Sequence, residues 1–179
     1  MNIPHEHTIY TIGHSTHALE DFLAILQSFA IEMLVDIRRF PGSRRFPQFN
    51  KENLKDSLNK NSIGYVHIEE LGGRRKPYKD SKNTVWRNVS FRGYADYMET
   101  EEFRRAVAAL QAIAGQSRTV YMCSEALWWR CHRSMVSDYL MANGWTVFHI
   151  MGLNKAEEHR YTAPANVAGN RLWYTDKKV

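Results

Sequence analysis

TVYMCSEALWWRCHRSMVSDYLMANGWTVFHI, residues 119–150, decides the fold because it contains a strand, a helix and a second strand in succession. The run 119–123 is short and apolar, which is typical of a buried strand. Apolar residues then share one helix face: Met135, Val136, Tyr139 and Leu140. Gly144 ends that helix, and residues 145–150 are predicted to form the next strand.

The same alternation occurs earlier in the chain. Strands are predicted at 8–12, 33–37 and 65–68. Helices are predicted behind possible caps at Thr16 and Asn50, and over 94–98 and 103–113. Strands that alternate with helices favour parallel pairing with right-handed crossovers. We therefore predict an α/β fold of three layers, doubly wound, with a mostly parallel five-stranded sheet and helices on both faces.

The length of 179 residues fits a single domain with a self-sufficient core. We place one α/β domain at residues 1–152. The segment 153–179 lacks clear periodicity, so we expect a C-terminal extension that packs on the domain, stays flexible or reaches a partner.

No run of about 18 apolar residues is present, and the first ten residues lack the layout of a secretory signal. We therefore expect a cytoplasmic protein with no membrane partner. Its two cysteines are too few for a disulfide framework, which favours free thiols or ligands.

Positive charge is concentrated in the middle third of the chain. Residues 38–92 contain 14 of the 24 Lys and Arg but only five of the 19 Asp and Glu. Aromatic residues, including Phe40, Phe46 and Phe91, are interleaved with these cations. Cations neutralise phosphate and aromatic faces stack on bases, so the segment suits a nucleotide or nucleic acid. A basic solvated loop would show the same composition.

Polar and reactive residues follow the predicted strands. In open α/β sheets, ligands bind outside the carboxyl ends of the strands. The candidates at these ends are Gly13, His14, Ser15, Arg38, Arg74, Cys123, Glu125 and His149. We therefore predict that these strand ends form one phosphate-seeking cleft.

Cys123, Glu125 and His14 are the predicted catalytic residues. Cys123 ends a strand before a helix, where arginines and a helix N-terminus would favour the thiolate. A cysteine on an apolar strand can equally be buried and inert. Glu125 suits an acid or base, or pairs with a nearby arginine. His14 lies in a turn after Gly13, and either faces a ligand or bonds its own backbone.

Several arginines are predicted to bind an anion. Arg38 follows Asp36, and the pair forms either a binding site or a clamp for the loop that follows. A Pro-Gly-Ser turn directs Arg44 toward the same region, and a Gly-Gly pair precedes Arg74. Arg130 and Arg133 begin the helix after Cys123, whose N-terminus attracts negative charge.

A zinc site is a competing interpretation. Cys123, Cys131 and His132, with His14 or His149, supply donors that zinc prefers. The C-x7-C-H spacing is unusual, however, and Cys131 and His132 point about 100° apart on a helix. We therefore predict no metal, keep Cys131, His132 and His149 as possible site residues, and identify no particular cofactor.

An ordered set of motifs resembles the domain-of-unknown-function family 488. The motifs are TIGHST at 11–16, VDIRRFPGSRRFPQFN at 35–50, LGGRR at 71–75, FRGYADYM at 91–98, EF at 102–103 and MCSEALWWRCHRSMVSDYL at 122–140. The resemblance covers about residues 8–152 and implies a single bacterial-type α/β domain. It implies no particular activity.

Two function classes fit these features. The first is an enzyme that acts on a nucleotide or nucleic acid through Cys123 and Glu125. The second is a binding module in which the same arginines and aromatic residues hold that ligand and Cys123 is structural or redox-sensing. A phosphate-bearing ligand is expected in both, and the oligomeric state is left open.

Overall fold

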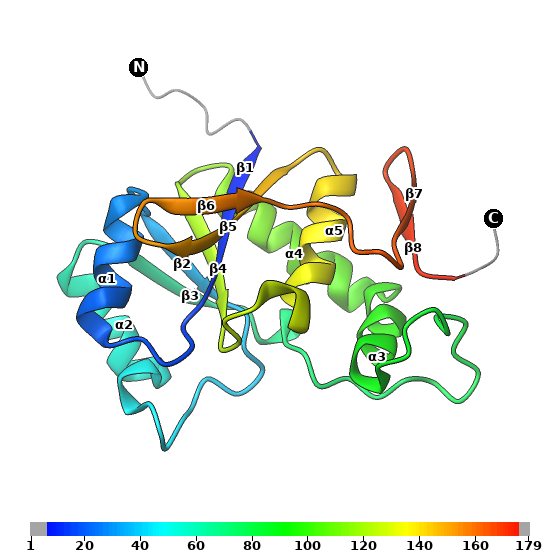
Figure 1. Ribbon diagram of the computed structural model, residues 1–179, viewed down its shortest axis with the longest axis horizontal. Coiled ribbons are helices and arrows are strands. Elements are labelled where there is room, and N and C mark those ends of the chain that lie inside the picture. The colour runs from blue at the N-terminus through cyan, green and yellow to red at the C-terminus, as the bar shows by residue number, and fades with distance from the viewer. Residues whose placement is uncertain (1–6, 176–179) are drawn as a thin grey trace.

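The computed structural model describes residues 7–175 (Figure 1). Its helices are α1 (Leu19–Ser28), α2 (Lys51–Lys60), α3 (Val89–Met98), α4 (Glu101–Ala114) and α5 (Arg133–Ala142). Its strands are β1 (Thr8–Gly13), β2 (Met33–Asp36), β3 (Gly64–His67), β4 (Thr119–Cys123), β5 (Thr146–Gly152), β6 (Lys155–Glu158), β7 (Asn166–Ala168) and β8 (Arg171–Trp173). Short 3-10 helices are η1 (Pro47–Phe49), η2 (Glu69–Leu71) and η3 (Trp128–Arg130).

The main sheet has six strands in the order β3-β2-β4-β1-β5-β6. The first five strands in this order pair in parallel, and β6 pairs with β5 in the antiparallel direction. The predicted three-layer, doubly wound α/β fold is confirmed. The prediction of five strands omitted β6, because its four residues are all exposed and show no apolar pattern.

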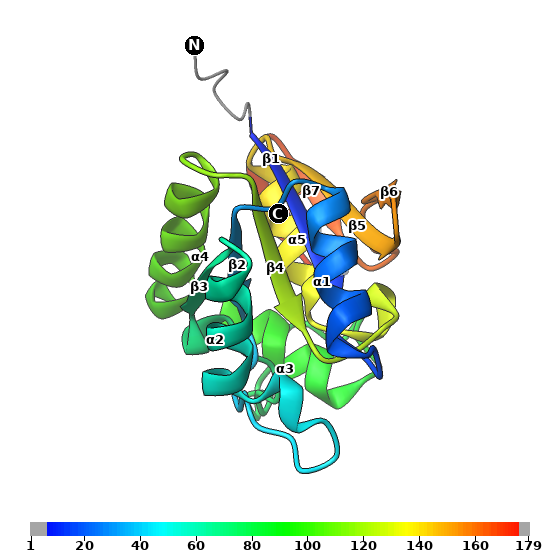
Figure 2. The same ribbon diagram turned by 90° about the vertical axis from the view of Figure 1, so that its left-hand side faces the viewer.

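Helices cover both faces of the sheet (Figure 2). Apolar residues of α1 and α2 pack on one face, against side chains such as Ile12 and Leu34. Helices α3, α4 and α5 pack on the other face, against side chains such as Val35 and Tyr121. Each buried Leu or Phe in these two layers contributes about 2 kcal/mol to folding. None of the helices within residues 7–175 is both long and apolar enough to cross a membrane.

The starts of α1 and α5 differ from the predicted ones, and the cap of α2 lies at the predicted residue but bonds elsewhere. Ala18, not Thr16, occupies the N-cap of α1 and makes no side-chain capping bond. Asn50 is the N-cap of α2, but its side-chain oxygen accepts a hydrogen bond from the Ser43 backbone instead, at 2.6 Å. Helix α5 begins at Arg133, because residues 128–130 form η3 first. This last difference places Cys131 just before the helix.

Residues 153–175 are tied to the rest of the fold. Strands β5 and β6 form a hairpin across the predicted domain boundary. The buried Asp138 carboxylate of α5 then accepts hydrogen bonds from His159, Thr162 and Tyr174. A buried carboxylate needs such donors, so Asp138 fixes the C-terminal segment on α5.

Candidate active site

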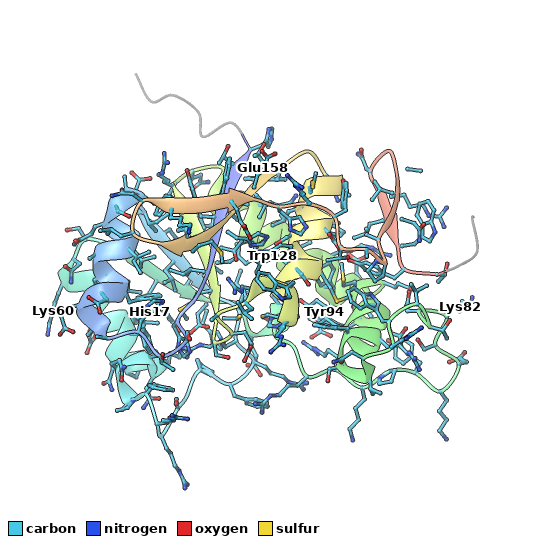
Figure 3. All side chains as sticks on the ribbon, in the orientation of Figure 1. His17, Lys60, Lys82, Tyr94, Trp128 and Glu158 are labelled. Atoms are coloured by element: carbon cyan, nitrogen blue, oxygen red, sulfur yellow. The ribbon has the colours of Figure 1, made fainter. Side chains whose placement is uncertain are left out.

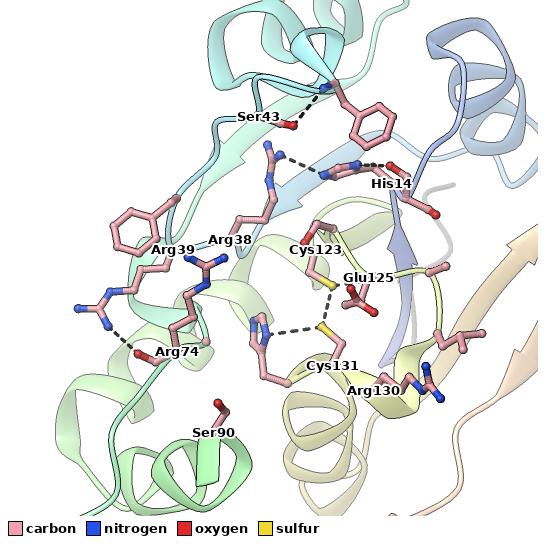
Figure 4. Close-up of a pocket in the computed structure, with 18 of the residues that line it drawn as sticks. His14, Arg38, Arg39, Ser43, Arg74, Ser90, Cys123, Glu125, Arg130 and Cys131 are labelled. Atoms are coloured by element: carbon pink, nitrogen blue, oxygen red, sulfur yellow. Dashed lines mark hydrogen bonds between the residues drawn. The ribbon is translucent and has the colours of Figure 1, made fainter. Parts of the chain in front are cut away.

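A cavity of about 710 Å³ opens at the carboxyl ends of the parallel strands (Figure 4). Its wall comes from the residues that follow β1, β2 and β4 and from the N-terminal turn of α3. The predicted site residues among its lining are His14, Ser15, Arg38, Arg74, Cys123, Glu125, Arg130, Cys131 and His132. The fold therefore brings together groups that lie more than a hundred positions apart in the sequence.

Two cysteine sulfurs lie in contact in this cavity. The Sγ atoms of Cys123 and Cys131 are 2.7 Å apart, and both residues are free thiols. Cys123 ends β4 and is 2% exposed, whereas Cys131 precedes α5 and is 5% exposed. Figure 4 shows the two sulfurs pointing toward one another. The His132 Nδ1 atom lies 3.5 Å from Cys131 Sγ. Within residues 7–175, no set of three or more His, Cys, Asp or Glu side chains is arranged to hold a metal ion.

The surroundings of the two sulfurs favour Cys131 as the thiolate. Cys131 Sγ receives the backbone N–H of Arg133 at 3.5 Å and lies 3.5 Å from His132 Nδ1. Cys123 Sγ instead lies 3.9 Å from the Glu125 carbonyl oxygen, which only accepts hydrogen bonds. Next to this oxygen Cys123 keeps its proton, and it becomes the donor in the sulfur–sulfur contact once Cys131 ionises, because a thiolate can only accept.

These contacts shift the pKa values of the two cysteines in opposite directions. Burial opposes ionisation of Cys131, but the Cys123 thiol and the Arg133 charge outweigh it and lower the pKa of Cys131 to about 7. Burial, reinforced by Cys131, raises the pKa of Cys123 well above its usual value. Burial lowers the pKa of His132, so its ring is neutral.

Arg133 is a buried cation that pairs with no carboxylate among the described residues. Its side chain is fully enclosed, and its guanidinium donates to the Thr11 hydroxyl and to the carbonyls of Glu125 and Ala126. Its Nε has no partner within the described part of the chain. A buried cation costs several kcal/mol unless it is compensated. Ionisation of Cys131 would supply that compensation, and the Arg133 charge correspondingly lowers the pKa of Cys131.

Gly13 permits this arrangement. A Cβ at position 13 would lie 1.7 Å from the Glu125 carbonyl oxygen and 3.0 Å from the Arg133 guanidinium. Any side chain there would push the Glu125 carbonyl away from Arg133. Gly13 thus lets the loop after β4, and not a ligand, come close to β1.

Arg38 and His14 form a buried clamp at the edge of the cavity. The Arg38 guanidinium pairs with Asp36 at 2.7 Å and donates to the Phe49 carbonyl at 2.8 Å, which ties the loop after β2 to the sheet. It also donates to His14 Nε2 at 3.3 Å, while His14 Nδ1 donates to the Ser15 carbonyl at 3.0 Å. Burial and the Arg38 charge lower the pKa of His14 to about 4. Both ring nitrogens are engaged, so the geometry favours a structural role for His14.

Other arginines face the cavity without a carboxylate partner in the described part of the chain, although Arg39 donates to the Arg74 carbonyl at 3.2 Å. Arg39 and Arg74 lie on one side of the cysteine pair and Arg130 on the other (Figure 4). Phe40 is 62% exposed, with the guanidinium groups of Arg39 and Arg74 within 6 Å of its ring centre. Arg74 adopts a positive φ of 60°, an uncommon conformation outside glycine. Glu125 is the one carboxylate in the described lining.

Four predicted residues do not line the cavity: Gly13 and Arg133, which are described above, and Arg44 and His149. Arg44 is exposed on the loop after β2 but does not line the cavity. His149 lies behind Arg133, where a buried chain of hydrogen bonds runs from Thr11 through His149 to His159. Trp128 stacks on the His149 ring at 4.2 Å (Figure 3 shows its place near α5) and separates it from solvent. His149 therefore supports the floor of the site.

Several lining residues were not predicted to belong to the site. They are Thr16, Gly42, Ser43, Ser90, Ser124, Ala126 and Leu127. Others were noted only for their place after a strand or for their aromatic character: Arg39, Gly73, Phe40, Phe46, Phe91 and Tyr94. Ser90 carried no signal, because α3 reaches the cavity only through the long excursion after β3.

Comparison with known proteins identifies a family and no individual relative. The chain matches the family described as Domain of unknown function DUF488 over residues 18–140. This range runs from the start of α1 into α5 and includes both cysteines, whereas the TIGHST motif precedes it. Searches of curated proteins and of solved structures gave no match. The matched range is more than two-thirds of the chain, so the protein belongs to the DUF488 family.

Proposed function

We propose that this chain is a cytoplasmic, thiol-dependent enzyme that acts on a phosphate-bearing nucleotide or nucleic acid, with Cys131 as its nucleophile. One observation carries the proposal. A single cavity holds a sulfur placed to ionise and three arginines, Arg39, Arg74 and Arg130, that pair with no carboxylate within residues 7–175. A reducing cytoplasm would keep both cysteines as thiols.

Cys131 replaces Cys123 as the proposed nucleophile. The sulfur that attacks must be ionised and reachable, and Cys131 is favoured on both counts. Cys123 donates the hydrogen bond that holds the Cys131 thiolate, and the α5 N-terminus supplies a backbone N–H. The Glu125 carboxyl group is exposed at the cavity rim, where it suits proton transfer to or from a substrate atom.

The arginines give the cavity its preference for an anion. Cations that lack a carboxylate partner are available to bind phosphate oxygens, and the bidentate geometry of guanidinium suits them. The exposed Phe40 ring between Arg39 and Arg74 offers a platform on which a base can stack. The combination fits a ligand that contains both phosphate and a base better than it fits a free phosphate ion.

Equilibrium binding tests the proposal. Inorganic phosphate, nucleoside phosphates and short single-stranded oligonucleotides would be titrated into the protein at low salt. Arg39→Ala and Arg74→Ala should each weaken binding about tenfold, as expected for one charge-assisted contact. Arg44→Ala is the matched control, since Arg44 is an exposed arginine of the loop after β2 that does not line the cavity. Phe40→Ala should weaken nucleotide binding and leave inorganic phosphate unaffected.

A second readout separates an enzyme from a binding module. A bound ligand that reaches Cys131 should slow its alkylation, whereas a ligand held only at the rim should not. Equal losses in Arg44→Ala and Arg74→Ala would contradict the site. Tight binding that leaves the alkylation of Cys131 unchanged would favour the binding module.

A further inference from the structure

The two cysteines together have a capability that a single nucleophile lacks. Their Sγ atoms are 2.7 Å apart, and a disulfide bond is about 2.05 Å long, so only a small shift would join them. The residues come from separate elements, the end of β4 and the turn before α5. The contact therefore exists because the fold aligns the two elements.

We infer that Cys131 and Cys123 form a redox-active dithiol that reduces a small hydroperoxide, with Cys131 as the attacking sulfur and Cys123 as the resolving sulfur. The inference shares Cys131 with the proposed function but requires no phosphate-bearing ligand. Cys131 is the sulfur with three potential donors around it and the larger exposure, so it meets the oxidant first. With only 5% of the residue exposed, a small peroxide reaches it more easily than a bulky disulfide.

The reaction proceeds in two balanced steps. The Cys131 thiolate attacks the terminal peroxide oxygen, the O–O bond breaks, and the departing oxygen takes a proton from solvent to give an alcohol or water. Cys131 is then a sulfenic acid. Cys123 Sγ attacks the Cys131 sulfur, the S–S bond forms, the S–O bond breaks, and hydroxide leaves as water with the Cys123 proton. The two thiols supply the two electrons that reduce the peroxide.

The environment of the pair also makes the disulfide easy to reduce. Oxidation removes the negative charge of Cys131, which leaves Arg133 surrounded by uncharged hydrogen-bond partners. Stabilisation of the thiolate therefore favours the reduced form, as in other strongly oxidising dithiols. A low-molecular-weight monothiol can return the pair to the reduced state by two successive exchanges.

Product analysis after peroxide treatment tests the inference. The full chain, freed of reductant, would be treated with one equivalent of hydrogen peroxide and mapped by peptide mass spectrometry. We expect an internal Cys123–Cys131 disulfide that a monothiol reverses. In Cys123→Ser, oxidation should stop at the Cys131 sulfenic acid, which dimedone would trap. Cys131→Ser is the matched control and should form neither product.

Two results would overturn the inference. One is wild-type protein in which Cys131 passes to sulfinic acid without disulfide formation. The other is oxidation of Cys123 before Cys131. Nucleotide binding by the wild-type protein, measured in the same preparations, keeps this test separate from the proposed function. Wild-type protein that binds nucleotide but forms no disulfide on peroxide treatment would reject the dithiol alone.

Discussion

Replacement of Arg133 by methionine should suppress the ionisation of Cys131. Methionine fills much of the same buried space but carries neither the charge nor the guanidinium donors. The Arg133 charge is the second largest influence favouring the Cys131 thiolate, after the Cys123 hydrogen bond. We therefore expect Arg133→Met to raise the pKa of Cys131, with Arg133→Lys as a milder variant that retains the charge.

The size of the effect follows from the ionised fraction. With a pKa of about 7, half of the Cys131 thiols are ionised at pH 7. A rise of one unit in the pKa of Cys131 would lower the ionised fraction at pH 7 about fivefold. A full return of that pKa to its ordinary value of about 9 would lower the fraction about fiftyfold. We expect a loss within this range, because the Cys123 hydrogen bond remains in the variant.

Site-resolved alkylation measures the effect. Each protein would be treated with iodoacetamide from pH 5 to 10, and the rate at Cys131 would be read from its peptide. Far-ultraviolet circular dichroism would confirm that the variants are folded. An alkylation profile of Cys131 that is identical in Arg133→Met and wild type would refute the role assigned to Arg133.

Three further outcomes follow from the structure. Between pH 6.5 and about 4, His14 binds a proton in the unfolded state but not in the folded state, because its folded pKa is lowered to about 4. The free energy of unfolding of the wild type should therefore fall more steeply with falling pH than that of His14→Gln, which urea unfolding would measure. Gly13→Ala should lower the free energy of unfolding by about 2 kcal/mol or more, because its Cβ would overlap the Glu125 carbonyl; an unchanged denaturation midpoint would contradict this contact. If residues 38–92 contact duplex phosphates, nucleic-acid affinity should fall as salt concentration rises. The slope of log affinity against log salt should be about −0.9 for each phosphate contacted, and an affinity that does not change with salt would exclude those contacts.

The fold could largely be predicted because its buried strands are apolar and alternate with amphipathic helices. Parallel pairing and strand-end convergence then follow from general rules of α/β chains. Strand β6 escaped prediction because residues 155–158 are exposed and polar, and only pairing with β5 makes them a strand. Hydrophobic patterning carries no signal for such an edge strand.

The chemistry of the site could be predicted only in part. Residue spacing places Cys123, Cys131 and Arg133 in one region, but it does not determine which sulfur ionises. That choice depends on α5 starting at Arg133 rather than at Arg130, which gives a backbone N–H to Cys131. It also depends on the Glu125 carbonyl next to Cys123. These are differences of a few ångströms, which residue spacing does not determine.

The central claim is that Cys131 is the ionised sulfur of this cavity. The most direct test is the pH dependence of alkylation at each cysteine in the reduced wild-type protein, resolved by peptide mass spectrometry. We predict that Cys131 reacts first, with a midpoint near pH 7, while Cys123 stays unreactive until well above pH 9. The claim would be contradicted if the alkylation rate of Cys131 had its pH midpoint at or above about 8.5, the usual pKa of a thiol. Faster alkylation of Cys123 than of Cys131 would contradict it as well.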